Sequence, residues 1–298
     1  MKQYKYFALI NAINNHNSLY ESLNFKEKYF GINLELFKIN SSNRRIVLDE
    51  PFSIKSLFLT YLISFKFDYD IIIHNCNKWL NINNSKSSIK NNLKILLRVQ
   101  ILKNCTNIIV VSPTLKNYLK KYGYKNILYV PFSKRKNNLV KSKSDTFYII
   151  IPGSINNTKR YDRLELIISN TNFNTKVALV FLGISNSIYS KNILNKLKKV
   201  NHHNLSIVSF NSFVSNDSFH NWMLKANIIL SDFNENVKTD DAYIEKFGST
   251  KETGVPWLAF SYNIPLIMPS IYQNHFNELE IINIESLNSL DNIISEVL

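Results

Sequence analysis

The sequence predicts an α/β protein with two doubly wound domains, each built around a mostly parallel sheet. Short apolar runs rich in Ile, Val, Phe and Tyr alternate with longer stretches of helical periodicity, as βα units require. A polar, basic run at 134–145, KRKNNLVKSKSD, interrupts this pattern, which then starts again. The 298 residues, 45% of them hydrophobic, are enough for two cores.

The first domain is predicted over residues 1–134. Its strands are expected at 5–13, 34–39, 70–75, 107–112 and 126–131, and its helices at 18–30, 54–65, 89–102 and 113–122. The last helix has the clearest signals, because Ser112 can cap it, Pro113 suits its first turn and Gly123 suits its end.

Residues 135–145 are predicted to be a linker, and residues 146–298 a second domain. Its strands are expected at 147–153, 176–183, 205–210, 227–233 and 264–269, with helices that include 191–200, 217–225 and 255–262. Ligands of doubly wound sheets bind beyond the carboxyl ends of the strands, so these ends are where a site is expected.

Positive charge is concentrated in the first half of the chain. Residues 1–134 hold 20 Lys and Arg against 7 Asp and Glu, whereas residues 146–298 hold 12 against 14. This asymmetry predicts that the first half faces an anionic partner, which could be a membrane surface, an acidic acceptor or a nucleic acid. A basic surface that serves only solubility is the alternative.

The cysteine content and the hydropathy of the sequence indicate the cellular compartment. Cys76 and Cys105 are too few and too isolated for a disulfide framework or a zinc site, so a reduced, cytoplasmic chain is expected. The N-terminal apolar run is interpreted as a strand rather than a signal peptide. The most apolar long segment, 56–75, is interrupted by Lys66, Asp68 and Asp70, so no transmembrane helix is expected.

The loop after the predicted strand 147–153 combines a glycine turn with two adjacent cations. Gly153, followed by Ser154, allows a ligand to approach the backbone closely. Lys159 and Arg160 are placed to reach an anion over the sheet edge. The alternative is an ordinary βα loop with solvated cations.

A second segment, EKFGSTKETGVPWLAFSYNIPLIMP at 245–269, leads from an acidic loop through a glycine turn into a helix and a strand. A helix start rich in hydroxyls and glycine suits a phosphate or diphosphate, because it offers unpaired N–H groups and the positive end of the dipole. The residues predicted to line it are Ser249, Thr250, Lys251, Thr253 and Gly254. The alternative is a capped helix that packs on its strand.

These motifs occur together and in this order, and they resemble the second domain of the GT-B glycosyltransferases, which use nucleotide sugars. That domain opens with a strand and a glycine loop bearing a basic pair, here Gly153, Lys159 and Arg160. It continues with a helix and strand similar to 224–230, and closes with a loop and strand similar to 245–248 and 263–267. The segment 107–133 looks like the last unit of the family's first domain.

The resemblance implies two Rossmann-like domains that face a central cleft, with the acceptor on residues 1–134 and the nucleotide sugar on residues 146–298. Lys159 and Arg160 would hold the donor diphosphate and stabilise its charge as it leaves. The donor-binding set implied by the family is Gly153, Ser154, Lys159, Arg160, Glu245, Phe247, Gly248, Ser249, Thr250, Lys251, Thr253 and Gly254, with Asp232 and Asn234 as weaker candidates. A UDP- or GDP-sugar would be the donor substrate, with no metal and no cofactor, and Asp240-Asp241 is interpreted as a solvated loop.

Glu245 would accept hydrogen bonds from ribose or sugar hydroxyls, and it stands with two histidines as a catalytic candidate. His16 and His74 both follow predicted strands of the first domain, where a neutral imidazole could take the proton of the acceptor hydroxyl. Inverting transfer needs such a base and retaining transfer does not, so the sequence leaves the stereochemistry open. A structural histidine at a strand end is the alternative for each.

The predicted function is therefore transfer of a sugar from a nucleotide sugar to a glycan or lipid-linked acceptor in bacterial surface polysaccharide synthesis. The basic first half is expected to lie on the inner face of a membrane as a peripheral contact. A basic nucleic-acid-binding protein is a rival, although no recognisable binding module is present, and a nucleotide-sugar epimerase on the same fold is another.

Overall fold

The computed structural model describes residues 5–10, 27–30, 44–51, 53–82, 88–130, 144–200, 202–239, 242–272 and 279–297, with side chains from residue 47 onward. The chain divides into two compact units. The first unit comprises Met1–Ser133 and Glu235–Thr253, and the second comprises Lys134–Asn234 and Gly254–Leu298. The predicted domains met near residue 134 as well, but residues 235–253 were assigned to the second domain and instead pack with the first unit.

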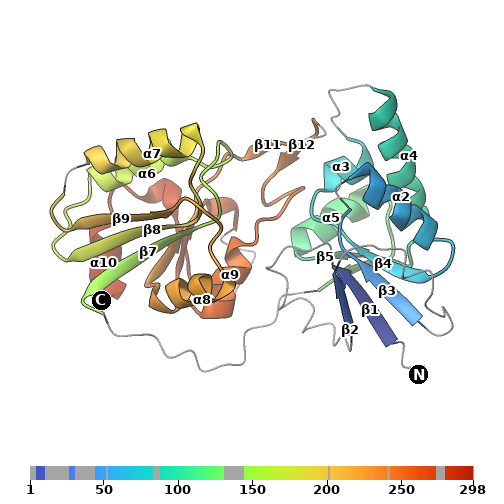
Figure 1. Ribbon diagram of the computed structural model, residues 1–298, viewed down its shortest axis with the longest axis horizontal. Coiled ribbons are helices and arrows are strands. Elements are labelled where there is room, and N and C mark those ends of the chain that lie inside the picture. The colour runs from blue at the N-terminus through green and yellow to red at the C-terminus, as the bar shows by residue number, and fades with distance from the viewer. Residues whose placement is uncertain are drawn as a thin grey trace. The chain divides into compact units, whose positions relative to one another are not determined.

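The first unit contains a parallel six-stranded sheet in the order β2-β1-β3-β4-β5-β6 (Figure 1). The strands are β1 (Lys5–Ile10), β2 (Glu27–Phe30), β3 (Arg44–Leu48), β4 (Asp68–Ile72), β5 (Asn107–Val110) and β6 (Ile127–Tyr129). The helices are α2 (Ile54–Ile63), α3 (Cys76–Leu80), α4 (Ile89–Asn104) and α5 (Pro113–Lys121). The strand order reverses between β1 and β3.

The strands and helices predicted for the first half from residue 54 onward are present, although the short helix α3 among them was missed. Residues 27–30 form a strand where the end of a helix was expected, because they pair in parallel with β1. Strand β3 and the short helix α3 were not predicted. The strand expected at 34–39 and the start of the helix expected at 18–30 lie outside the described residues.

Serine caps explain where three helices of the first unit begin. Ser53, Ser88 and Ser112 precede α2, α4 and α5, and each hydroxyl accepts a hydrogen bond from the N–H three residues later. The apolar faces of these helices pack on the strands and form one core, which includes Leu57, Ile71, Trp79, Ile101, Val110 and Leu119. The near-continuous apolar strands are those of a parallel sheet that helices cover.

Segment 235–253 joins the first unit through the N-terminus of α3. It forms the antiparallel hairpin of β11 (Asn236–Lys238) and β12 (Ile244–Lys246). The carboxylate of Glu245 accepts hydrogen bonds from the N–H groups of Asn77 and Lys78, at 3.2 and 2.8 Å. The N–H of Cys76 donates to the carbonyl of Thr250 at 2.8 Å. The first three N–H groups of α3, which no helical carbonyl can reach, therefore all find acceptors in this segment.

The second unit contains another parallel six-stranded sheet, in the order β14-β13-β10-β7-β8-β9. Its strands are β7 (Thr146–Pro152), β8 (Lys176–Ile184), β9 (Leu205–Phe210), β10 (Ile228–Leu230), β13 (Leu266–Met268) and β14 (Ile281–Asn283). Its helices are α6 (Tyr161–Ser169), α7 (Ile188–Lys199), α8 (Asn216–Lys225), α9 (Val255–Tyr262) and α10 (Asp291–Val297), with 3-10 turns η2 (Ser270–Tyr272) and η3 (Ile284–Ser286). All the strands and helices specified for this half are present, and β14 and α10 are additional.

The order of the second sheet reverses at β7. The chain runs from β7 outward through β8 and β9, then returns through α8 to β10 on the other side of β7 and continues outward to β13 and β14. Right-handed crossovers then place α6 and α7 on one face and α8 and α9 on the other, as Figure 1 shows. The loops after β7 and β10 thus leave neighbouring strands in opposite directions, which opens a crevice at their carboxyl ends.

Replacing Glu245 by Ala tests whether this segment is anchored by the cap on α3. The change leaves the buried N–H groups of Asn77 and Lys78 without their acceptor, at a cost of about 1–3 kcal/mol. Hydrogen exchange measured by mass spectrometry should therefore be about tenfold or more faster in α3. The matched control is Glu235→Ala on the same hairpin, which removes only an exposed ion pair with Lys246. Equal protection of α3 in the two variants would contradict the capping role.

Candidate active site

The carboxyl edge of the second sheet brings together most of the residues predicted for the basic loop. Gly153 follows β7 with a φ of +85°, a left-handed conformation that favours glycine. The loop from Gly153 to Arg160 is tied to the loop after β10. The N–H of Arg160 donates to the carbonyl of Asp232 at 3.3 Å, and the N–H of Asn234 donates to the carbonyl of Thr158 at 2.8 Å.

Lys159 is held in this loop by backbone carbonyls rather than by a carboxylate. Its Nζ donates to the carbonyl of Pro152 at 2.5 Å and lies 3.5 Å from that of Gly153. Burial lowers the pKa of Lys159 to about 8, because a desolvated ammonium lacks a compensating charge. An anion bound over the loop would supply that charge and would favour the protonated form.

Asp232 and Arg163 form an ion pair beneath the loop. Arg163 Nε lies 3.3 Å from the carboxylate of Asp232, which is almost fully buried. Burial raises the pKa of Asp232 to about 6, although Arg163 and Arg160 oppose this shift. Arg163 is thus matched with a carboxylate, whereas Arg160 forms an exposed ion pair with Asp162 at 3.6 Å. Arg160 can exchange that weak contact for a ligand at little cost.

Gly183 near the end of β8 sets the position of the Gly153 turn, and the sequence analysis did not identify this role. A Cβ at Gly183 would lie 2.4 Å from the carbonyl carbon of Gly153 and 2.7 Å from the nitrogen of Ser154. Only glycine lets the two strand ends approach this closely. The signal in the sequence is that KVALVFLG, a buried strand, ends in glycine next to a strand that also ends in glycine.

Residues 249–254 were predicted to line the first turn of a helix, and this is not where the structure places most of them. Helix α9 begins at Val255, with Gly254 at the cap position. Ser249 to Thr253 belong to the first unit and precede the helix. Thr250 Oγ1 accepts a hydrogen bond from the N–H of Lys246 at 2.8 Å, closing a turn around the positive-φ residue Gly248. Phe247 is buried in this turn, with Lys251 Nζ 5.9 Å from the centre of its ring.

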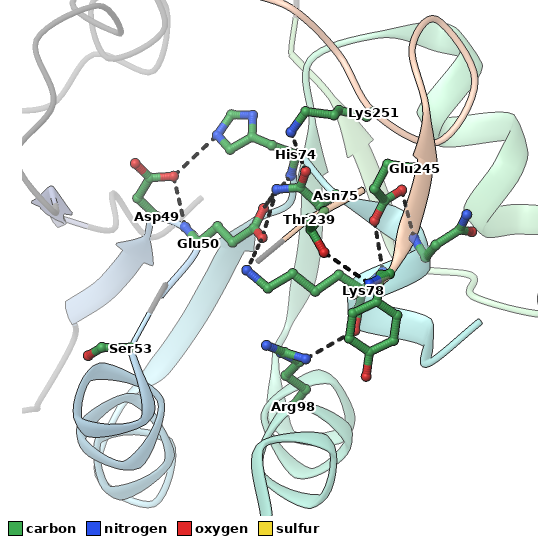
Figure 2. A network of polar contacts seen from close by, with 12 residues as sticks. Asp49, Glu50, Ser53, His74, Asn75, Lys78, Arg98, Thr239, Glu245 and Lys251 are labelled. Atoms are coloured by element: carbon green, nitrogen blue, oxygen red, sulfur yellow. Dashed lines mark hydrogen bonds and ion pairs between the residues drawn. The ribbon is translucent and has the colours of Figure 1, made fainter. Parts of the chain in front are cut away.

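The carboxyl edge of the first sheet holds a network of buried charges, shown in Figure 2. Asp49 and Glu50 follow β3, His74 and Asn75 follow β4, and Lys78 lies in α3. Figure 2 shows these side chains pointing toward one another, with Glu245 and Lys251 reaching the same cluster from segment 235–253. Of these, His74, Glu245 and Lys251 were predicted site residues. Asp49 and Glu50 were missed, although an acid pair directly after an apolar run signals a strand end.

Glu50 is fully buried and lies at the centre of this network. Its carboxylate accepts hydrogen bonds from Asn75 Nδ2 at 2.9 and 3.0 Å and from the N–H of His74 at 2.9 Å, and Lys78 Nζ lies 3.3 Å away. Burial acts to raise the pKa of Glu50, but Lys78, His74 and these hydrogen bonds outweigh it and lower the pKa below its ordinary value. Glu50 therefore stays ionised and holds His74 and Asn75 in place.

His74 and Asp49 form a dyad at the edge of this network. His74 Nε2 lies 3.3 Å from Asp49 Oδ1, and the histidine side chain is partly exposed. Burial acts to lower the pKa of His74, but the hydrogen bond and charge of Asp49, helped by Glu50, raise it above its ordinary value. The carboxylate orients the imidazole ring, and a histidine paired with a carboxylate in this way is suited to proton transfer.

Glu245 and Lys251 both have hydrogen-bond partners within the first unit. Glu245 is fully buried, and burial raises its pKa to about 7 despite the hydrogen bonds from Thr250 and from the N–H groups at the start of α3. Lys251 Nζ donates to Asn75 Oδ1, and burial lowers the pKa of Lys251. Glu245 was expected to accept hydrogen bonds from ribose or sugar hydroxyls. In the structure, both of its carboxylate oxygens accept hydrogen bonds from backbone N–H groups.

Three further expectations concern absences or residues not described. His16 lies outside the described residues. Within the described ranges, no group of three or more His, Cys, Asp and Glu could hold a metal ion. No helix in those same ranges is long and apolar enough to cross a membrane.

Comparison with known proteins identifies the fold. No protein-family model and no curated protein matches the chain. Solved structures do match. HepE from Anabaena, solved with UDP and glucose, superposes with a TM-score of 0.62 at 10% identity, covering 99% of this chain and 89% of its own. A glycosyltransferase from Rickettsia africae superposes with a TM-score of 0.56 at 14% identity, covering 100% and 88%.

TarM superposes with a TM-score of 0.57 at 12% identity, covering 89% of this chain and 49% of TarM. The fold is that of the GT-B glycosyltransferases. This confirms the fold class predicted from the sequence motifs. The chain spans about half the length of TarM and of the pneumococcal O-GlcNAc transferase GtfA, of which it covers 50%. At identities this low the likeness concerns the fold, and function has to be argued from the chain's own residues.

Replacing Gly183 by Ala tests the close approach of β8 to the turn at Gly153. The added Cβ must displace the backbone of Gly153 and Ser154, so we expect the unfolding free energy to fall by about 1–3 kcal/mol. Urea unfolding followed by circular dichroism measures the change. Gly254→Ala is the matched control, because a Cβ there meets nothing within 4 Å. A loss at Gly183 no larger than that at Gly254 would contradict the close contact.

Proposed function

We propose that this chain is a glycosyltransferase that takes its sugar from a nucleoside diphosphate sugar bound at the carboxyl edge of the second sheet. The observation that carries this proposal is the convergence of the Gly153 turn, Lys159 and Arg160 with the Asp232 loop at the point where the strand order reverses. This is the place in an open parallel sheet where nucleotides bind.

The chemistry of the loop fits a diphosphate. The turn at Gly153 lets an anion approach the backbone. The ammonium of Lys159 donates to two carbonyls and has no carboxylate partner in the part of the chain that the structure describes. Arg160 offers a planar donor pair for phosphate oxygens. When the bond between the anomeric carbon and the diphosphate breaks, charge grows on the leaving phosphate, and these fixed cations stabilise it without a metal ion.

UDP is the nucleotide we propose for the donor. HepE was solved with UDP and glucose, and GtfA with UDP and GlcNAc. Both share the fold of this chain, and the proposal extends their nucleotide to it. For the acceptor we propose the hydroxyl of a glycan or lipid-linked sugar in the synthesis of a bacterial surface polysaccharide.

His74 is the base we propose for a transfer that inverts the anomeric configuration. The imidazole takes the proton of the acceptor hydroxyl as its oxygen attacks the anomeric carbon, and Asp49 stabilises the imidazolium that forms. Retaining transfer needs no such base, and His74 would then be a binding residue. The pH dependence of turnover separates these two roles.

A thermal-shift panel of UDP, GDP and ADP tests the donor site. UDP is expected to raise the melting temperature most, and Lys159→Ala or Arg160→Ala should weaken its affinity about tenfold or more by removing a charged contact. Lys176→Ala is the matched control, because Lys176 is exposed at the start of β8, the opposite end of the same sheet. Unchanged stabilisation by UDP in both loop variants would show that the donor site is elsewhere.

The pH profile of kcat/KM tests His74. A base must be neutral, and Asp49 raises the pKa of His74, so activity should rise with pH through a midpoint above the ordinary value of about 6.5. Asp49→Asn removes the carboxylate that stabilises the imidazolium, so this midpoint should move to lower pH. His74→Ala should lower kcat by about 10²–10⁴-fold while UDP binding persists. A profile that neither variant alters rules out His74 as the base.

A further inference from the structure

Helix α4 exposes an apolar stripe to solvent. Ile89, Leu93 and Leu96 are 90%, 46% and 62% exposed. Their spacing of four and three residues puts them on one face of the helix. The buried side of the helix lies away from this stripe and includes Arg98, Ile101 and Leu102. The exposed apolar side chains are therefore separate from the side of α4 that packs on the sheet. Packing of the first unit does not explain why they are apolar.

Helix α2 adds aromatic side chains to the same layer of the first unit. Phe58 in α2 and Phe65 just after it are both exposed. α2 connects β3 to β4 and α4 connects β4 to β5, so the two crossovers advance in the same direction across the sheet. Right-handed crossovers then place both helices on one face. They pack against each other, and Asn104 at the end of α4 donates to Ser64 at the end of α2 at 3.2 Å.

The charged side chains of these two helices have one sign. Neither α2 nor α4 contains an acidic residue. Lys55 in α2 and Lys90 and Lys103 in α4 are exposed. Lysines beside exposed apolar side chains on a surface helix are typical of helices that lie in the headgroup region of a membrane, with the apolar side chains at the acyl boundary.

We propose that this surface, formed by Phe58, Phe65, Ile89, Leu93 and Leu96 with the lysines of α2 and α4, docks the chain on an anionic lipid bilayer. The charge complementarity favours a bilayer over a second copy of the chain, because two such surfaces would bring like charges together. The proposal goes beyond the sugar transfer proposed above. It identifies the residues through which an enzyme acting on a membrane-borne acceptor would reach it.

Vesicle flotation tests this surface. The full chain is mixed with vesicles of phosphatidylcholine, with or without phosphatidylglycerol, and should float with the anionic vesicles. The double variant Leu93→Glu/Leu96→Glu should lower the partition coefficient about tenfold or more, because it places two carboxylates in the apolar stripe. The matched control is Leu166→Glu/Ile188→Glu, which adds the same charge at exposed apolar positions on α6 and α7 of the second unit.

Each outcome decides for or against the proposal. Loss of flotation in the α4 variant alone, with its UDP-induced melting shift retained, supports it. Equal flotation of the wild type and the α4 variant overturns it, as does an equal loss in the control, which would reflect net charge alone. Absence of wild-type flotation also overturns it, and a dimer in sedimentation velocity that the α4 variant abolishes would then assign the surface to a second copy. The melting shift with UDP tests the donor site separately, so the two proposals can fail independently.

Discussion

The architecture of both units depends on one constraint, the right-handed crossover between parallel strands. Because each sheet reverses its strand order, at β1/β3 in the first unit and β7/β10 in the second, the loops at the carboxyl edge separate there. The residues of the two candidate sites follow these strands: Asp49 after β3 and His74 after β4 in the first unit, and Gly153 after β7 and Asp232 after β10 in the second. The apolar strands beneath them form the rigid support.

Buried charged side chains lie at the carboxyl edges of both sheets. A buried charge is costly unless it is paired, and Glu50 meets this requirement with Lys78, Asn75 and the N–H of His74. Asp232 meets it with Arg163. Lys159 instead donates to backbone carbonyls, and burial lowers its pKa. The contrast separates charges that are paired within the fold from Lys159, which we propose as a contact for the diphosphate.

The sequence predicted the elements whose signals are local, and failed where a distant segment decides. The strands at 147–153 and 176–183 and the helix at 113–122 were predictable from apolar runs and from the Ser112 cap. Helix α3 was not, because five residues carry no periodicity and its N–H groups are satisfied by Glu245 and Thr250, far away in the chain. The same long-range contact, from the N–H of Cys76 to the carbonyl of Thr250, ties this stretch to the first unit, so Ser249 to Thr253 do not form the expected start of a helix. Gly153, Lys159 and Arg160 could be proposed from the sequence because one loop carries all three, whereas Asp49 and Glu50 were missed because they follow a strand, β3, that was not predicted.

The central claim is that the carboxyl edge of β7 and β10 binds the diphosphate of a nucleotide sugar. A crystal structure of the chain soaked with UDP tests it most directly, because it locates the phosphates without relying on turnover. The account predicts diphosphate oxygens within hydrogen-bond distance of Lys159 or Arg160, above the turn at Gly153. A diphosphate bound anywhere else on the chain, with that edge left unoccupied, would contradict it.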